Sequence, residues 1–177
     1  MLRNLRMTSL STAAAAMMAI AALGTSTASV AQARNTPASQ VNSTFPDSIK
    51  RAAIASSEGE HGSIAGTRIA NTNYFVVYIK SQGWCGSGGC RAQIWTLAGG
   101  RPVRKESISV GYLPIVLLPG VDNGMPRIGV TTVAAGNRLA ILPIAFDGQS
   151  YTNAMHDNLL TPNSGKPILT QAMLRPF

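Results

Sequence analysis

The chain has 177 residues, of which 45% are hydrophobic and only 12% charged. This composition excludes an intrinsically disordered protein and is sufficient for one domain with a hydrophobic core. Lys and Arg outnumber Asp and Glu by 15 to 7, which favours weak attraction to anionic lipids, wall polymers or acidic proteins. The basic residues are scattered and no aromatic residues alternate with them, so a nucleic-acid-binding surface is not expected.

The first 33 residues have the pattern of an export signal peptide. Arg3 and Arg6 precede an alanine-rich apolar run over residues 12–23, and Ala31-Gln32-Ala33 matches a cleavage site, so we expect the mature chain to begin at Arg34. Removing two of the 15 basic residues leaves 13 against 7 acidic ones, a net charge of +6. The apolar run is shorter than the ~20 residues of a transmembrane helix. We therefore expect a periplasmic or secreted protein with no transmembrane segment after cleavage.

The mature chain is predicted to consist of a flexible leader over residues 34–44 and a single globular domain over residues 45–177. Pro46 and Asp47 are typical of a helix start, and the alanine-rich stretch that follows predicts a short helix ending near Ser56 or Ser57. The glycine-containing stretch from Glu58 to Gly66 is predicted to be a loop.

Strands are predicted from this loop onward. Tyr74–Ile79 is apolar at every position and predicts a central strand, whereas Arg91–Leu97 alternates between two faces. Prolines bound Ile115–Leu118 and interrupt Leu139–Phe146 at Pro143, so the first is expected to be a short or edge strand and the second to lie at an edge or contain a bulge. The remaining predicted strands are Val103–Val110, Arg127–Val133 and a short return strand from Tyr151.

Turn signals recur about every ten residues from Gly83 onward, including Asn123-Gly124 and Asp147-Gly148, as in an antiparallel meander. The tail after Pro162 is predicted to be mostly irregular, with one or two helical turns within residues 167–174. The sequence therefore predicts an α+β fold, in which a short N-terminal helix packs on a curved antiparallel β meander of five to seven strands in a single domain.

The stretch Trp84–Cys90, here called the cysteine loop, contains the only two cysteines of the chain, Cys85 and Cys90. In an oxidising compartment such a pair is usually a structural disulfide, which we expect here. A redox-active pair is an alternative, although thioredoxin-like sites use a two-residue spacer before a helix. Two thiols without nearby histidines do not complete a zinc shell.

Four small residues between the cysteines make this a possible binding loop, together with Trp84 before them: Gly86, Ser87, Gly88 and Gly89. Glycine-rich backbone can present several N–H groups to an anion. Ser87 also resembles the nucleophile of trypsin-like proteases, but the chain is too short for that double barrel, and Gly86 replaces the acidic residue that precedes the serine in that family.

Other residues with possible chemistry have simpler explanations, and no catalytic or metal-ligating residue and no cofactor is predicted. Glu58, Glu60 and His61 could offer metal ligands but lie in a loop without helical spacing. His156 and Asp157 are adjacent, and adjacent side chains seldom face each other. Turn chemistry accounts for Asp122 and Asp147. Core packing accounts for three aromatic residues that could line a binding face: Trp84, Tyr112 and Tyr151.

The order of motifs resembles a group of small, mostly uncharacterised exported proteins of Gram-negative bacteria. The matching features are the loop Cys85-Gly86-Ser87-Gly88-Gly89-Cys90, the segment Leu113–Leu118, the Asn123-Gly124 turn and the terminal Phe146-Asp147-Gly148-Gln149-Ser150-Tyr151. The group has a C-G-[ST]-G-G-C loop and an F-D-G-x-x-Y hairpin, and the match covers about residues 74–151. Met125–Gly129 replaces a tryptophan and an aspartate that follow the Asn-Gly turn in the group. The resemblance implies an exported, disulfide-containing, compact β-rich domain.

Two functions are compatible with these features. The first is a non-enzymatic envelope protein that binds an anionic envelope component or another exported protein. The alternative is a small periplasmic hydrolase acting on cell-wall material, which would need a histidine–acid pair or an acid with a raised pKa in a cleft. Bringing His61 and His156 together with Glu58 or Glu60 would favour the hydrolase.

Overall fold

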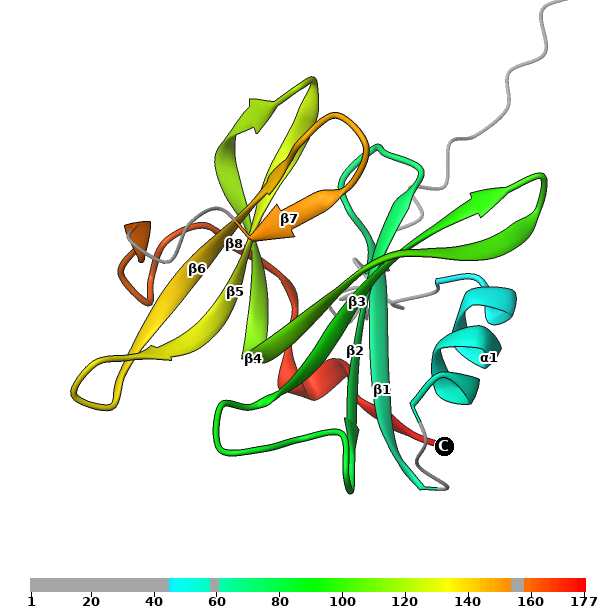
Figure 1. Cartoon of the computed structure of the whole chain (residues 1–177), viewed down its shortest axis with the longest axis horizontal. Helices are drawn as coiled ribbons and strands as arrows, with labels where there is room; N and C mark the ends of the chain where they lie inside the picture. The colour runs from blue at the N-terminus through cyan, green and yellow to red at the C-terminus, as the bar shows by residue number, and fades with distance from the viewer. Residues whose placement is uncertain (1–44, 58–60, 154–157) are drawn as a thin grey trace, which may run out of the picture. The chain divides into compact units, whose positions relative to one another are not determined.

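A computed structural model describes residues 45–57, 61–153 and 158–177, all of which belong to one compact unit. The predicted signal peptide, its cleavage site and the predicted leader lie outside the described residues, as do Glu58, Glu60, His156 and Asp157. The model is mainly antiparallel β-sheet with one α-helix (Figure 1). Within the described residues no helix has the length and apolar character needed to cross a membrane.

Helix α1 spans Asp47–Ala55, close to the predicted boundaries. Pro46 occupies the N-cap, and its carbonyl accepts the first helical hydrogen bond from the Lys50 N–H at 3.0 Å. Nine residues are too few for an isolated helix to be stable in water, so packing must hold it. Ile49 and Ala53, four residues apart on one face, are completely buried against the sheet.

In the described part of the chain, nine strands form one sheet with the order β7-β6-β5-β4-β3-β2-β1-β9, and β8 pairs with β4 outside this path. The predicted class is correct, but the predicted count of five to seven strands is too low. The bounds are β1 Gly62–Arg68, β2 Tyr74–Ser81, β3 Cys90–Ala98, β4 Arg101–Asp122, β5 Met125–Ala134, β6 Arg138–Phe146, β7 Tyr151–Asn153, β8 Lys166–Leu169 and β9 Arg175–Pro176.

Strand β1 occupies most of the stretch predicted to be the Glu58–Gly66 loop, so that prediction is wrong from Gly62 onward. The glycines that indicated a loop are required by close packing. A Cβ on Gly66 would lie 2.6 Å from the Phe45 ring, and a Cβ on Gly62 would lie 2.6 Å from the Lys80 carbonyl oxygen. Glycine thus permits neighbouring groups to approach a strand backbone closely here.

The two strands predicted at Val103–Val110 and Ile115–Leu118 are parts of one 22-residue strand, β4. Its first half pairs with β3, and its second half pairs with β5 on one side and β8 on the other. Residues 115–118 therefore have neighbours on both sides, contrary to the predicted short or edge strand. Register shifts near Tyr112–Ile115 change the strand's course, so β4 connects two halves of the sheet (Figure 1).

The tail is more ordered than predicted. Residues 166–169 form β8, Gln171–Met173 form the 3-10 turn η2, and β9 follows. Only the short 3-10 turn corresponds to the predicted helical turns. Because β8 pairs with β4 and β9 pairs with β1, this segment links two strands that are three positions apart in the sheet order.

Pro143 lies in β6 between β5 and β7, but at a position that β7 does not reach. The Ile141 N–H donates to the Leu160 carbonyl oxygen at 2.9 Å. Alternate residues of an antiparallel strand direct their nitrogens to the same side, so the Pro143 nitrogen faces the interval between this bridge and β7. Neither the Leu160 bridge nor the described part of β7 requires an N–H donor from this position.

Strand β2 buries both faces, as predicted for Tyr74–Ile79. Val76 and Tyr78 face a large core enclosed by the two halves of the sheet, together with Ile94 and Ile108. The alternate residues of β2 face a second core under α1: Phe75, Val77 and Ile79, joined by Trp84 and Trp95. The predicted alternation of β3 follows the same division, since Ala92 and Ile94 face the first core and Trp95 the second.

Candidate functional site

The cysteine loop connects β2 to β3 and is closed by the predicted disulfide between Cys85 and Cys90, with an S–S distance of 2.07 Å. Inside the ring, Gly86 and Gly89 exchange two backbone hydrogen bonds of 2.8 and 3.0 Å. The loop is thus a miniature hairpin whose tip is Ser87-Gly88. Gly89 has φ of +104°, a conformation that residues with a Cβ rarely adopt.

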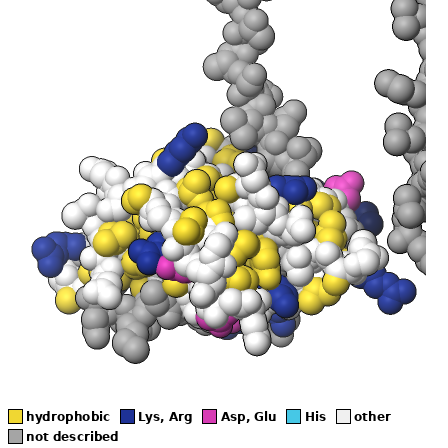
Figure 2. Space-filling model, turned by 90° about the horizontal axis from the view of Figure 1, so that it is seen from above, with side chains coloured by type: hydrophobic (Ala, Val, Ile, Leu, Met, Phe, Trp, Pro, Cys, Tyr) yellow, Lys and Arg dark blue, Asp and Glu magenta, His cyan; other side chains and the backbone are white. Residues whose placement is uncertain are grey.

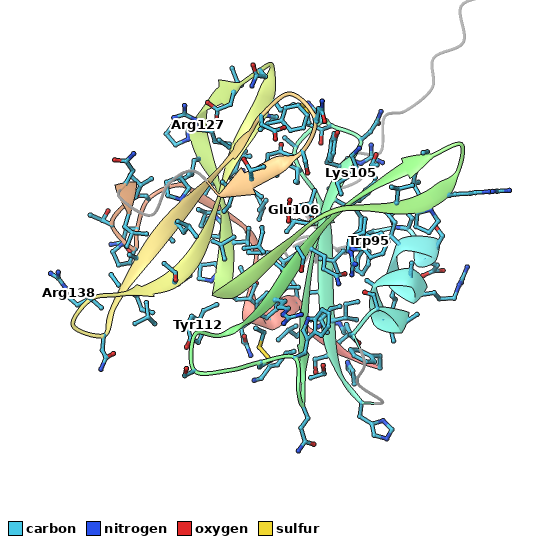
Figure 3. All side chains as sticks on the ribbon, viewed as in Figure 1. Trp95, Lys105, Glu106, Tyr112, Arg127 and Arg138 are labelled. Carbon is cyan, nitrogen blue, oxygen red and sulfur yellow. A yellow bond between two sulfur atoms is a disulfide. The ribbon has the colours of Figure 1, made fainter. Side chains whose placement is uncertain are left out.

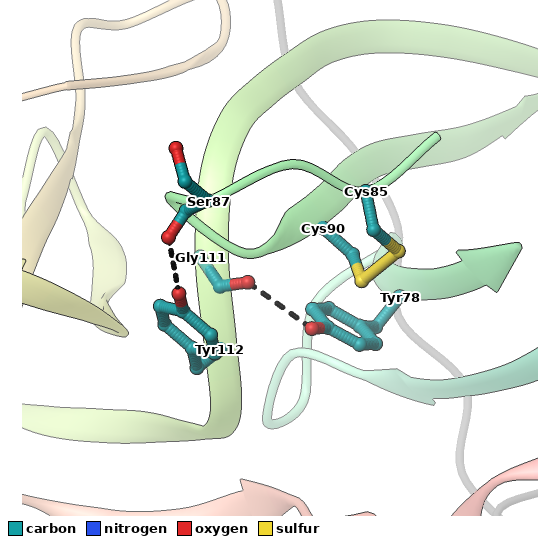
Figure 4. Close-up of a disulfide and its surroundings, with 6 residues drawn as sticks. All are labelled: Tyr78, Cys85, Ser87, Cys90, Gly111 and Tyr112. Atoms are coloured by element: carbon teal, nitrogen blue, oxygen red, sulfur yellow. Dashed lines mark hydrogen bonds between the residues drawn. A yellow bond between two sulfur atoms is a disulfide. The ribbon is translucent and has the colours of Figure 1, made fainter. Parts of the chain in front are cut away.

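Two tyrosines, one in β4 and one in β2, make hydrogen bonds at and beside the cysteine loop. The Tyr112 hydroxyl donates to the Ser87 carbonyl oxygen at 2.7 Å, and the Tyr78 hydroxyl donates to the Gly111 carbonyl oxygen at 3.1 Å (Figure 4). Gly89 packs so closely on Gly111 that a Cβ would lie 2.2 Å from the Gly111 oxygen. Burial raises the pKa of Tyr78 above its ordinary value, so this hydroxyl stays protonated and remains a donor. The disulfide and the Tyr112 hydrogen bond therefore fix the loop, and the Tyr78 hydrogen bond holds Gly111, on which Gly89 packs.

Trp84 and Arg91 flank the disulfide. The Arg91 guanidinium lies 4.8 Å from the centre of the Trp84 ring, within the range of a cation–π interaction. Trp84 is only 8% exposed and packs in the second core, whereas Arg91 is exposed. The contact holds the guanidinium over the ring while the side chain stays exposed, and a guanidinium has five N–H donors that can bind a planar anion.

A shallow depression of about 340 Å³ lies at this end of the sheet, lined by the loop backbone, Trp84 and Arg91. Its described lining residues run from Gly83 to Gly89 and include Arg91, and none of them is acidic. Within the described ranges 45–57, 61–153 and 158–177, the one ion pair of the chain is Arg127–Asp122. The depression therefore has a positive charge whose guanidinium forms no ion pair within those ranges.

The residues that would carry catalysis are only partly placed. Ser87 is exposed at the loop tip, and among the described residues no histidine or acid lines the depression beside it. His61 is exposed and precedes Gly62, which pairs with Ser81 at the end of β2, so it lies at the same end of the sheet as the loop. Its proposed companions Glu58, Glu60, His156 and Asp157 lie outside the described residues. Among the placed residues, no three His, Cys, Asp or Glu side chains cluster as metal ligands would.

Both aspartates assigned to turns occur at strand ends. Asp147 Oδ1 accepts hydrogen bonds from the N–H groups of Gln149 at 2.7 Å and Ser150 at 2.8 Å, and these bonds lower its pKa. Asp122 instead binds Arg127, whose Nε lies 2.7 Å from Oδ2, and this bond lowers the pKa of Asp122. Turn chemistry thus accounts for Asp147, and an ion pair across the β4–β5 hairpin accounts for Asp122.

The three aromatic residues with possible binding roles serve the fold. Tyr151 is fully buried, and its hydroxyl donates to the Pro126 carbonyl oxygen at 2.9 Å. Its ring makes edge contacts with Phe146 at 5.3 Å and Tyr74 at 5.7 Å. Tyr112 and Trp84 support the cysteine loop as described above. Of the three, only Trp84 lines the depression.

Three residues of this site were not grouped with the cysteine loop from the sequence: Arg91, Tyr78 and Gly111. Arg91 directly follows Cys90 and alternates with buried Ala92, which was a usable signal that it points away from the first core. Gly111 is separated from the loop by more than twenty residues, and only the β3–β4 pairing of Cys90 with Gly111 brings it there.

No protein-family model matches the chain, and neither a curated protein nor a solved structure similar to it was found.

Proposed function

We propose that this chain is a small exported protein of the bacterial envelope that acts by binding, without catalysis, and that the cysteine loop holds an anionic envelope component. The observation that carries the proposal is the Arg91 guanidinium, stacked on Trp84 beside a loop whose backbone is fixed. A positioned guanidinium binds carboxylate or phosphate through two parallel hydrogen bonds, and prior fixation reduces the entropy lost on binding.

Export and membership of the C-G-[ST]-G-G-C group are parts of the same proposal. The signal-peptide pattern of residues 1–33 and the motif order from Tyr74 to Tyr151 support them. A disulfide is typical of proteins in oxidising compartments, and Cys85–Cys90 agrees with that environment.

The overall charge favours an anionic ligand over a cationic one. Basic residues outnumber acidic ones by 15 to 7. Figure 2 shows Lys and Arg side chains spread over the face seen from above and separated by hydrophobic and polar ones, with no continuous basic stripe. Such a surface attracts anions generally, so selection has to come from one organised group. Arg91, held by an aromatic ring, is such a group.

The experiment is isothermal titration of the exported protein with soluble, carboxylate-bearing fragments of cell-wall polymer. Two variants accompany the wild type: Arg91→Ala, and Arg101→Ala as a control that removes an exposed arginine from the β3–β4 hairpin. We expect Arg91→Ala to weaken binding at least about tenfold, which corresponds to a lost charge-assisted hydrogen bond, and Arg101→Ala to leave it nearly unchanged.

Arg91→Lys separates charge from geometry, because lysine keeps the charge but loses the planar fork. We expect it to bind between wild type and Arg91→Ala. Equal losses in Arg91→Ala and Arg101→Ala would contradict a specific site. Hydrolysis of the same fragments by wild-type protein would replace the binding proposal with the hydrolase alternative.

A further inference from the structure

The second half of the sheet has an apolar outer face, on the side opposite the large core. Val116, Leu118 and Ile141 form a small buried cluster there. The segment that follows β7 covers it: Leu160 bridges to Ile141, and a Cβ on Gly165 would lie 3.0 Å from the Leu118 side chain. This part of the face is closed by the chain itself.

The cover ends toward the turn between β5 and β6. Val133 and Leu139 are cross-strand partners. Leu139 lies two residues from Ile141 in β6, and Val133 lies two residues from Thr131, the β5 partner of Ile141. Both side chains therefore lie on the same face as Ile141. They are 38% and 53% exposed, and Leu159 and Leu160 beside them are each 37% exposed. Most large exposed hydrophobic side chains of the described residues therefore gather at one place.

This place, called here the β5–β6 end, comprises Val133, Arg138, Leu139, Leu159 and Leu160. A shallow depression of about 600 Å³ separates the start of β6 from residues 159–162. Figures 1 and 3 show the hairpin projecting away from β1–β3, with Arg138 at its free end. No acidic side chain lines the depression among the described residues, so Arg138 gives the apolar end a positive charge.

We propose that the β5–β6 end docks on an anionic lipid surface. Exposed leucines beside a basic residue at a projecting hairpin can enter the head-group layer, where the apolar side chains leave water and the cation meets lipid phosphates. A second copy of the chain is disfavoured, because two positive ends would face each other. The proposal concerns a surface separate from the cysteine loop and does not depend on the ligand bound there.

The test is co-sedimentation of the exported protein with two kinds of vesicle. The anionic vesicles contain phosphatidylethanolamine and phosphatidylglycerol, and the neutral vesicles contain phosphatidylcholine alone. Every variant has the same N-terminus, so any contribution from residues before the domain cancels. Leu139→Ser tests the apolar contact and Arg138→Gln the charge. Val121→Ser is the apolar control, since Val121 is 64% exposed in the β4–β5 hairpin, and Arg101→Gln is the charge control.

We expect binding to the anionic vesicles only. Leu139→Ser should weaken it about tenfold and Arg138→Gln about fivefold, while both controls stay within about twofold of wild type. Circular dichroism verifies that each variant is folded. Absence of vesicle binding, equal binding to both vesicles, or equal losses in the control variants would each overturn the proposal. Binding of an acidic protein in place of the vesicles would also overturn it.

Discussion

The backbones of Gly89 and Gly111 are in direct contact, so a Cβ on Gly89 would lie 2.2 Å from the Gly111 carbonyl oxygen. Gly89 also has a positive φ of +104°. Both constraints act on backbone atoms, which cannot move aside as a flexible side chain can. We predict that Gly89→Ala lowers the free energy of unfolding by about 2 to 4 kcal/mol, measured by urea denaturation.

Gly86 provides the matched control for this substitution, since it belongs to the same loop but a Cβ there would meet nothing within 4 Å. Gly86→Ala should change the free energy of unfolding by no more than about 0.5 kcal/mol. A similar loss in both variants would show that the loop tolerates no side chain at all, and would contradict the role assigned to the Gly89–Gly111 contact.

Removal of the disulfide should have a modest effect on the whole fold. The ring closed by Cys85 and Cys90 spans a sequence separation of 5. In the loop-entropy model so small a ring contributes about 2 kcal/mol. We predict that the double variant Cys85→Ala, Cys90→Ala loses about this amount in urea denaturation and keeps the far-ultraviolet circular dichroism of the sheet.

The same variant should lose most of the binding assigned to the cysteine loop, because the backbone beside Arg91 is no longer fixed. Wild-type protein treated with a thiol reductant serves as the comparison and should behave alike. Complete failure of the double variant to fold would show that the loop determines the β2–β3 pairing itself.

Acid should weaken the turn between β6 and β7. The N–H groups of Ser150 and Gln149 lower the pKa of Asp147, so its carboxylate is favoured in the folded state. A lowered folded pKa gives stability that is present above the unfolded value of about 3.9 and is lost as the pH falls through the folded pKa. We predict that the melting temperature declines below about pH 4, and that Asp147→Asn, which keeps the acceptor oxygen, declines less steeply.

Asp122 gives a separate acid-sensitive contribution through Arg127, so its variant is the control for the Asp147 assignment. Asp122→Asn should independently make the decline of the melting temperature below about pH 4 less steep, and the effects of the two substitutions should add. A wild-type melting temperature that does not change between about pH 5 and pH 2 would refute both assignments.

The hydroxyl groups of two tyrosines in the same aromatic cluster should contribute differently to the free energy of unfolding. Tyr151 is completely buried and donates to the Pro126 oxygen at 2.9 Å, whereas the Tyr74 hydroxyl is 3.4 Å from the Gln149 oxygen in an exposed position. Tyr151→Phe keeps the ring contacts but removes the hydrogen bond to the half-buried Pro126 carbonyl. We predict a loss of about 1 to 3 kcal/mol for Tyr151→Phe and less than about 0.5 kcal/mol for Tyr74→Phe in urea denaturation.

The elements predicted best are those whose pattern is local. The helix from Asp47, the two-sided burial of Tyr74–Ile79 and the turn at Asp147-Gly148 each follow from nearby residues, and the structure places them within a few residues of the predicted bounds. The disulfide followed from two cysteines and the expected compartment.

The elements that were missed depend on distant partners. Gly62 and Gly66 indicated a loop because nothing nearby reveals that Lys80 and Phe45 pack against them. The tail lacked an alternating pattern because β8 and β9 have four and two residues, too few to display a period. Arg91 was missed as a site residue for a similar reason, since its stacking on Trp84 requires the hairpin to be closed.

Phe177 and Gly62 exchange two backbone hydrogen bonds, with the Phe177 N–H donating at 3.1 Å and the Gly62 N–H at 3.4 Å. Strand β9 and the residue after it thus pair with β1. Until residues 166–177 are available, β1 and the second half of β4 each keep unpaired backbone groups, and pairing at this sequence separation is slow. Completion of the sheet beside both strands therefore depends on the pairing of one short segment.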